Sequence, residues 1–288
     1  MRRNYAEFIL AVVLFGMNGV ITSYIALSSY EIVFFRTMFG SLILMCFFFL
    51  TGHRFTFWNH WLHFFFQLLS GIANAACWLF LYEGYQQIGV GITTLLSYCG
   101  PIIAMIFSPI VFKEKLTKIQ IFGFLTVIAG FFLLNGKIGG EFRNTWGILC
   151  GILSGVLFAV LIIFNKKAES IVGLEKSTLQ MVSCFLTVAA FIAVKQGRLI
   201  QPTPSDWPPI LILGIVNTGL GALFYYTSMG KLPVQATSVL GYLEPLSALV
   251  FSFLILGETM DAIQIAGALL ILSGVMIAEL IRPKSAAA

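Results

Sequence analysis

Ten apolar segments divide the sequence, and each has the length of about twenty residues that a helix needs to cross the hydrocarbon core of a bilayer. They cover residues 5–27, 31–50, 64–85, 91–112, 118–135, 146–165, 177–194, 208–229, 234–256 and 262–281. The segments show no strict alternation of polar and apolar residues, which a membrane-spanning barrel would require. The sequence therefore predicts an all-α integral membrane protein with ten transmembrane helices.

The composition excludes a soluble globular protein. Hydrophobic residues make up 59% of the chain and charged residues 10%, whereas soluble domains are about half apolar and about a quarter charged. The net charge of +5 does not indicate nucleic-acid binding, because the Lys and Arg residues lie in short clusters between apolar segments. The expected partners are the lipid bilayer and a small molecule, with no nucleic acid, metal or cofactor.

The distribution of basic residues predicts the orientation in the membrane. When the ten helices alternate in direction, most of the 17 Lys and Arg residues fall on the side of the N-terminus. Positively charged loops remain on the cytoplasmic side, so both termini are predicted to be cytoplasmic. The first segment is interpreted as a retained helix rather than a cleaved leader. Residues 284–288 are expected to be an appended tail outside the fold.

The second half of the sequence repeats the first at a distance of 144 residues. Identical residues at this shift include Tyr82/Tyr226, Thr93/Thr237, Tyr98/Tyr242, Pro101/Pro245, Glu114/Glu258, Gln120/Gln264, Gly123/Gly267 and Gly130/Gly274. Asn74 and Asn217 match with a slip of one residue. A shared apolar bias does not explain matched Tyr, Pro, Glu and Gln residues. Residues 1–144 and 145–283 are therefore predicted to be two five-helix repeats, and the odd number of helices inverts the second repeat across the membrane.

Several short motifs carry a family resemblance. They are Phe15-Gly-Met-Asn18, Phe34-Phe-Arg36, Gly100-Pro101 followed by Lys113-Glu114, and Glu244-Pro245 followed by Gly257-Glu258. With these motifs the chain resembles the drug/metabolite transporter superfamily, in its EamA-like branch. The resemblance implies a central cavity between the two inverted repeats, lined by the first, third, fourth, sixth, eighth and ninth helices. It also implies export and a bacterial inner membrane.

Glu244 is the first candidate for a functional residue. It lies near the middle of its apolar segment, where a charge costs several kcal/mol unless it is paired, hydrated or protonated. Thr237, Gly241 and Glu244 have the spacing of one helix face, which suits a polar pocket. Glu244 either binds a cationic group of the substrate or carries a coupling proton. The alternative is a protonated structural residue that bonds a neighbouring helix.

Other polar and aromatic residues are candidates for the same pocket. Aromatic rings attract cations and stack on flat ligands, although they also mark the membrane interfaces. Amides within the membrane either contact substrate or join helices. Arg36 and Glu83 lie toward the outer ends of their segments and are predicted to form an ion pair, either a gate or a static contact. The predicted substrate-binding residues are Glu244, Tyr242, Tyr98, Trp78, Asn18, Asn74, Asn217, Tyr82 and Thr237.

Together these features predict a secondary active transporter that works by alternating access. No Walker motif is present in the sequence. The expected substrate is a small cationic or aromatic-bearing metabolite, such as an amine, amino acid or nucleoside-like compound, moved by export or exchange with a proton as candidate coupling ion. One alternative is an uncoupled facilitator. Another is an intramembrane lipid-modifying enzyme, but no His lies within a predicted segment, so the chain is predicted not to be an enzyme.

Overall fold

The structure is a computed structural model of the whole chain. It describes residues 2–113, 116–135, 144–196, 200–229, 231–232, 237 and 240–280. Glu114 and the predicted tail 284–288 lie outside the described residues. Within the described ranges the regular structure is helical, and no β-strand occurs there.

Seven helical segments among the described residues are long and apolar enough to cross a membrane. They are Arg2–Thr22, Ser29–Leu50, Trp61–Ile88, Val90–Phe112, Thr145–Lys167, Gly173–Lys195 and Trp207–Tyr225. Three shorter apolar helices, Lys118–Gly130, Leu243–Leu256 and Ala262–Ile277, lie where the sequence predicts the fifth, ninth and tenth segments. The predicted class, an all-α integral membrane protein, is confirmed.

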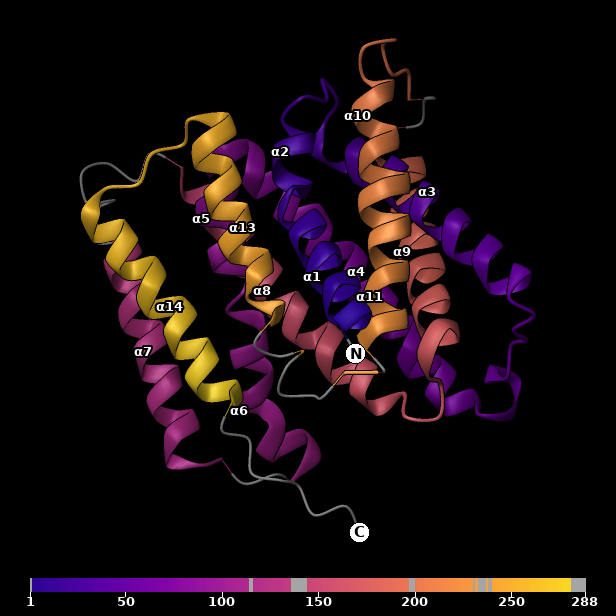
Figure 1. Cartoon of the computed structure of the whole chain (residues 1–288), viewed down its shortest axis with the longest axis horizontal. Coiled ribbons are helices and arrows are strands. Elements are labelled where there is room, and N and C mark those ends of the chain that lie inside the picture. The colour runs from indigo at the N-terminus through magenta and orange to yellow at the C-terminus, as the bar shows by residue number, and fades with distance from the viewer. Residues whose placement is uncertain are drawn as a thin grey trace.

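Several of these segments are divided into shorter elements. The elements are α1 (Arg2–Gly16), α2 (Asn18–Thr22), α3 (Ser29–Leu50), η1 (Phe57–Asn59), α4 (Trp61–Ile88), α5 (Val90–Ser97), α6 (Gly100–Phe112), α7 (Lys118–Asn135), α8 (Thr145–Lys167), α9 (Gly173–Gln196), α10 (Trp207–Leu211), the π-helical η2 (Ile212–Leu220), α11 (Gly221–Met229), α13 (Leu243–Phe251), the π-helical η3 (Ser252–Leu256) and α14 (Ala262–Leu280). Figure 1 shows their arrangement.

Two of the helix breaks occur at equivalent places in the sequence repeat. A turn at Tyr98 separates α5 from α6, and a turn at Tyr242 precedes α13. Pro101 and Pro245 follow within the first turn of the next helix, where proline is tolerated because its missing N–H has no helical partner there. A further break at Met17 separates α1 from α2.

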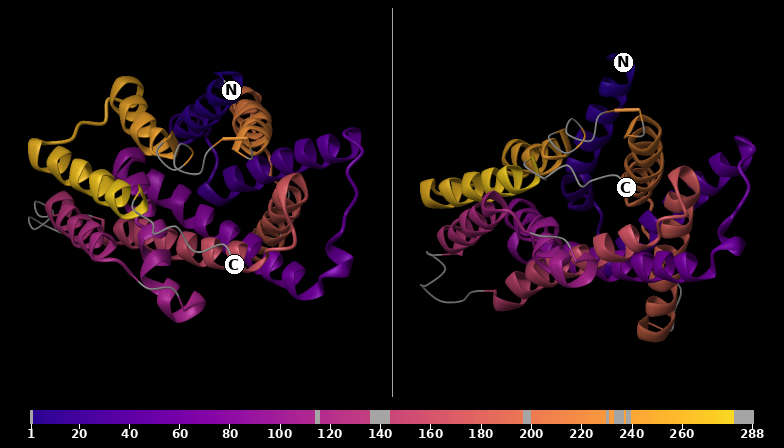
Figure 2. Two further views of the ribbon diagram at one scale, coloured as in Figure 1. Left: turned by 60° about the horizontal axis from the view of Figure 1, so that its bottom comes forward. Right: turned by 90° about the horizontal axis from the view of Figure 1, so that it is seen from below.

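The helices α7 and α14 lie side by side at one edge of the molecule (Figures 1 and 2). A Cβ atom added at Gly130 would lie 2.6 Å from the carbonyl oxygen of Gly267, and one added at Gly274 would lie 2.7 Å from that of Gly123. The order of these contacts makes the two helices antiparallel. Glycine permits this close approach of two backbones.

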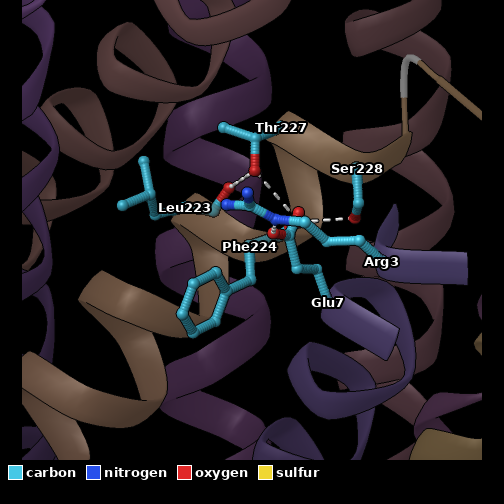
Figure 3. Close-up of polar contacts among 6 residues, drawn as sticks. All are labelled: Arg3, Glu7, Leu223, Phe224, Thr227 and Ser228. Atoms are coloured by element: carbon cyan, nitrogen blue, oxygen red, sulfur yellow. Dashed lines mark hydrogen bonds and ion pairs between the residues drawn. The ribbon is translucent and has the colours of Figure 1, made fainter. Parts of the chain in front are cut away.

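The rest of the bundle is built from long contacts between helices. α4 packs along α8, α3 lies between α9 and η2, and α1 contacts both α11 and α13. Figure 3 shows the start of α1, where Arg3 binds Glu7, beside α11, where the hydroxyls of Thr227 and Ser228 donate to carbonyls of their own helix. Hydroxyls that bond their own helix need no other partner in the membrane.

The carboxylate of Glu258 binds the ends of two helical elements. The carboxylate of Glu258 accepts hydrogen bonds from the backbone N–H groups of Val90, at 2.8 Å, and Gly91, at 3.0 Å, and from the hydroxyl of Ser252, at 2.7 Å. These N–H groups begin α5 and have no partner within the helix. Glu258 therefore ties the end of η3 to the start of α5.

Candidate functional site

Arg36 is a buried charge in the middle part of α3. Its side chain is 4% exposed, and its guanidinium lies over the ring of Trp78, with 3.9 Å from Cζ to the ring centroid. One terminal nitrogen donates a hydrogen bond to the hydroxyl of Tyr82. Trp78 and Tyr82 are four residues apart on α4, so both face α3. The cation is thus held by aromatic groups.

The predicted ion pair between Arg36 and Glu83 does not form in the described structure. The Glu83 carboxylate instead accepts hydrogen bonds from Ser29 at 2.6 Å, Gln87 at 3.1 Å and Trp146 at 3.2 Å. Consecutive residues of a helix point about 100° apart, so Tyr82 and Glu83 do not both face Arg36. A gating role for Arg36 and Glu83 stays a prediction.

Glu244 lies in the first turn of α13, directly after the turn at Tyr242. Tyr98 lies at the equivalent break between α5 and α6. The partial positive charge of a helix N-terminus favours an anion at the position of Glu244. No ion pair joins Glu244 to Arg36 among the described residues.

Two tyrosines of α4 pack against each other beside Arg36. The rings of Tyr82 and Tyr85 are 5.3 Å apart, and Tyr85 accepts a hydrogen bond from Thr94. Tyr85 is not among the predicted substrate-binding residues, although its spacing of seven residues from Trp78 places both on one helix face.

The three predicted amides have different environments. The amide nitrogen of Asn217 donates to the carbonyl of Leu14 at 2.6 Å and to the side-chain oxygen of Asn18 at 3.2 Å. Leu14 lies one turn before the break at Met17. Asn18 and Asn217 therefore join α2 and η2 in this structure. Asn74 is only 6% exposed, and its side chain makes no hydrogen bond with any residue that the structure describes.

The remaining two candidates lie elsewhere or are only partly described. Tyr242 is buried in an apolar cluster with Leu95, Leu96 and Ile271, whereas Trp78 and Tyr82 belong to a different cluster. Thr237 is buried, and its neighbours on both sides in the chain lie outside the described residues. The contacts of the described residues therefore bring together Arg36, Trp78 and Tyr82, which we call the central cluster.

A buried Arg held by aromatic rings within a helical membrane protein is typical of a functional site on a substrate or ion pathway. The comparisons agree with such a pathway. The chain belongs to the EamA-like transporter family, whose model matches residues 5–136 and again residues 145–280. Three predictions are confirmed: the chain belongs to this family, it is a transporter, and it is not an enzyme.

The chain is also similar to individual transporters, two of which are named for their substrates. The chain is 23% identical over 282 residues to an uncharacterized transporter, YxxF, of Bacillus subtilis, covering 94% of this chain and 88% of the relative. It is 23% identical over 276 residues to an S-adenosylmethionine uptake transporter of Rickettsia prowazekii, covering 92% and 88%. It is 27% identical over 193 residues to the riboflavin transporter ImpX of Fusobacterium nucleatum, covering 64% of each chain.

The fold also matches a solved structure. A protein known from its crystal structure superposes with a TM-score of 0.65 at 18% identity, covering 97% of this chain and 99% of the other. This likeness supports the fold alone. The relatives' names support a transporter of small molecules in the membrane.

Proposed function

We propose that this chain is a secondary active transporter that carries a small metabolite across a bacterial inner membrane by alternating access. Both termini are cytoplasmic in this proposal. Ten transmembrane helices form two inverted five-helix repeats, residues 1–144 and 145–283, around a central substrate site. Net movement is export or exchange, and a proton is the candidate coupling ion.

The contact between α7 and α14 is the observation that carries the proposal. Gly130 approaches Gly267, and Gly274 approaches Gly123, and each residue of the second pair is the repeat equivalent of one in the first. Two antiparallel helices with exchanged equivalent contacts are related by a pseudo-two-fold axis perpendicular to them. In a bilayer such an axis lies in the membrane plane, which is the symmetry of inverted-repeat transporters. Two related halves give conformations of similar energy that open to opposite sides.

The interruptions of two helices support the position of the substrate site. Substrate sites of such transporters lie near the midplane at interrupted helices, and both Tyr98 and Tyr242 lie at interruptions. Glu244, at the second interruption, is proposed to bind a cationic part of the substrate or to carry the proton. The relatives named for S-adenosylmethionine and riboflavin act on compounds with flat heteroaromatic rings, and the first is also a cation. This supports a cationic or aromatic-bearing substrate.

Counterflow into proteoliposomes tests the proposal. Vesicles with the full-length protein are loaded with an unlabelled compound, and entry of the labelled form is followed for S-adenosylmethionine, riboflavin, an amino acid and an organic cation. A carrier gives a transient accumulation of label above equilibrium, whereas a channel gives simple equilibration. Accumulation of at least one compound is expected, and equilibration of every compound that enters, or entry of none, would contradict the proposal.

A pH gradient separates coupled transport from facilitation. Wild type is expected to concentrate its substrate in response to an imposed proton gradient, and Glu244→Gln is expected to lose this response. Glu7→Gln is the matched control, because Glu7 lies at the start of α1 and binds Arg3. Counterflow without any response to pH in wild type would instead identify an uncoupled facilitator.

A further inference from the structure

The loop between α3 and α4 exposes large aromatic side chains. α3 ends at Leu50 and α4 begins at Trp61, and both helices are long and apolar enough to cross a membrane, so residues 51–60 lie at a surface of the bilayer. The connection lies at an outer edge of the molecule (Figure 1). Trp58 and Trp61 are 70% and 68% exposed, and Leu62 is exposed as well. Tryptophan prefers this depth, because its ring is apolar and its N–H group is polar.

Hydrogen bonds and ring contacts fix the conformation of this loop. The carboxylate of Glu175, at the start of α9, accepts hydrogen bonds from the backbone N–H groups of Thr56, at 2.7 Å, and Phe57, at 2.9 Å, and from the hydroxyl of Thr56, at 2.7 Å. The ring of Phe57 is buried and stacks on that of Phe64, with 4.4 Å between their centroids. Trp58 follows Phe57 directly, so its side chain is held outside the fold.

Basic residues lie at the same end of the bundle. Arg54 is exposed in the loop, and Lys167 is the last residue of α8. The Nζ atom of Lys167 lies 5.4 Å from the ring centroid of Phe66 in α4. The contact between Ser170 and His63, with 2.6 Å from Oγ to Nδ1, also brings the end of α8 against the start of α4. The loop and the end of α8 therefore form one surface.

The charge balance of this surface is positive. Residues 51–63 and 166–176 hold four Lys or Arg residues against two acidic residues, Glu169 and Glu175. The carboxylate of Glu175 is bound to the backbone of the loop. Lys and Arg at a membrane surface attract anionic lipids, whose phosphate groups lie at the depth that tryptophan prefers.

The exposed loop also continues the surface that lipid chains cover. Phe49 and Leu50, at the end of α3, and Phe65, near the start of α4, are exposed. They belong to helices that cross the membrane, where acyl chains surround exposed apolar side chains. A phospholipid can therefore place its chains on these residues and its phosphate beside the basic residues of the loop, which a soluble partner cannot do.

We propose that the loop between α3 and α4, together with the end of α8, is a binding site for anionic phospholipid. Trp58, Trp61 and Leu62 enter the headgroup region, and Arg54 and Lys167 bind the phosphate group. The planar fork of N–H donors on Arg matches a phosphate in geometry. This site is separate from the central cluster and goes beyond the proposed function, so its test does not depend on the identity of the substrate.

Thermal stabilisation of the full-length protein in detergent tests the proposal, because a ligand that binds only the folded state raises Tm. The probes are phosphatidylglycerol, phosphatidylcholine with the same acyl chains, and glycerophosphate without chains. Phosphatidylglycerol is expected to bind about tenfold more tightly than phosphatidylcholine, as two basic residues at a membrane surface would give. Glycerophosphate is expected to leave Tm unchanged. Equal binding of the two lipids overturns the proposal, and stabilisation by glycerophosphate as strong as by phosphatidylglycerol would assign the site to a free anion instead.

Charge variants test the basic residues. Arg54→Gln/Lys167→Gln is expected to bind both lipids equally. Lys195→Gln is the matched control and is expected to keep the preference of wild type, because Lys195 lies at the opposite end of α9, with its Nζ atom 4.3 Å from the ring centroid of Tyr30. A preference for phosphatidylglycerol that persists in the double variant overturns the proposal.

Fluorescence quenching tests the contact with tryptophan, since brominated acyl chains quench the tryptophan side chains that they touch. In phosphatidylcholine vesicles with a minor fraction of brominated lipid, brominated phosphatidylglycerol is expected to quench more than brominated phosphatidylcholine. Trp58→Phe/Trp61→Phe is expected to remove this excess. Trp207→Phe is expected to retain it, because Trp207 packs against Phe35 near the opposite end of α3. An excess that remains in the double variant would place the anionic lipid elsewhere and overturn the proposal.

Discussion

The carboxylate of Asp206 accepts a hydrogen bond from the backbone N–H of Ala26, with 2.7 Å between Oδ1 and the nitrogen. The backbone N–H of Ser170 donates in the same way to Nδ1 of His63, at 3.1 Å. Ala26 and Ser170 are equivalent at the repeat distance of 144 residues, and His63 and Asp206 are equivalent at the slipped distance that also relates Asn74 to Asn217. The same tie between a loop and the start of a helix thus occurs twice, which supports the proposed repeat.

The tie at Asp206 predicts a dependence of stability on pH. The hydroxyl of Thr203 and the backbone N–H of Ala26 lower the pKa of Asp206 below its usual range. A carboxyl group with a lowered pKa stabilises the fold at neutral pH, and this contribution disappears as the pH falls through its folded-state pKa. Asp206→Ala is expected to cost about 1 kcal/mol at neutral pH, with a difference in Tm from wild type that narrows as the pH falls below the ordinary pKa of an aspartate and through the lowered pKa of Asp206.

Asp206→Asn is the companion variant, because its amide oxygen still accepts hydrogen bonds but carries no charge. It is expected to fall between wild type and Asp206→Ala at neutral pH. Its Tm difference from Asp206→Ala is expected to stay constant with pH. A difference between wild type and Asp206→Ala that grows on acidification would contradict this role.

The close approach of α7 and α14 predicts that small additions there are harmful. Gly130→Ala and Gly274→Ala each place a methyl group against the facing backbone, and overpacking of this kind costs about 1–3 kcal/mol. Gly241→Ala is the control, because no described residue from another part of the fold lies within 4 Å of its added Cβ. Thermal unfolding in detergent measures all three. Equal Tm values for Gly130→Ala and Gly241→Ala would show that the helices do not pack through these glycines.

The hydrogen bonds that Glu258 accepts from Val90 and Gly91 predict a local effect on hydrogen exchange at the start of α5. Glu258→Ala leaves the N–H groups of Val90 and Gly91 without their acceptor, at a cost of about 1–3 kcal/mol. Hydrogen exchange at these two amides is expected to accelerate in the variant. Glu7→Gln removes an exposed ion pair instead, and it is expected to leave hydrogen exchange at Val90 and Gly91 unchanged. Unchanged exchange at Val90 and Gly91 in Glu258→Ala would contradict the cap.

The two equivalent amides Asn74 and Asn217 are expected to differ. Asn217→Ala loses the contacts with Leu14 and Asn18, so its Tm is expected to fall by an amount that corresponds to about 1 kcal/mol. Asn74→Ala is expected to keep the Tm of the free protein but to weaken stabilisation by substrate, because Asn74 is buried without a hydrogen bond to any described residue. An equal loss of Tm in both variants would assign Asn74 a structural role.

Residues of the candidate site were predictable to different degrees. Glu244 stands out in the sequence because a carboxyl group within an apolar segment is costly wherever the neighbouring helices lie. The partners of Arg36 do not stand out, because the rotation of α4 decides whether Tyr82 or Glu83 faces Arg36. The expected pairing of Arg36 with Glu83 was wrong for this reason.

The sequence by itself determined that this protein spans a membrane, that its two halves are related and that it belongs to a transporter family. These properties depend on the length of apolar segments and on residue identities at a fixed distance along the chain, which need no knowledge of packing. Only the tertiary structure decided that Asn18 bonds Asn217, that Tyr85 packs against Tyr82, and that Arg36 binds Trp78 and Tyr82. Those contacts depend on how helices far apart in the chain rotate and approach, and the pattern along a single helix does not contain that information.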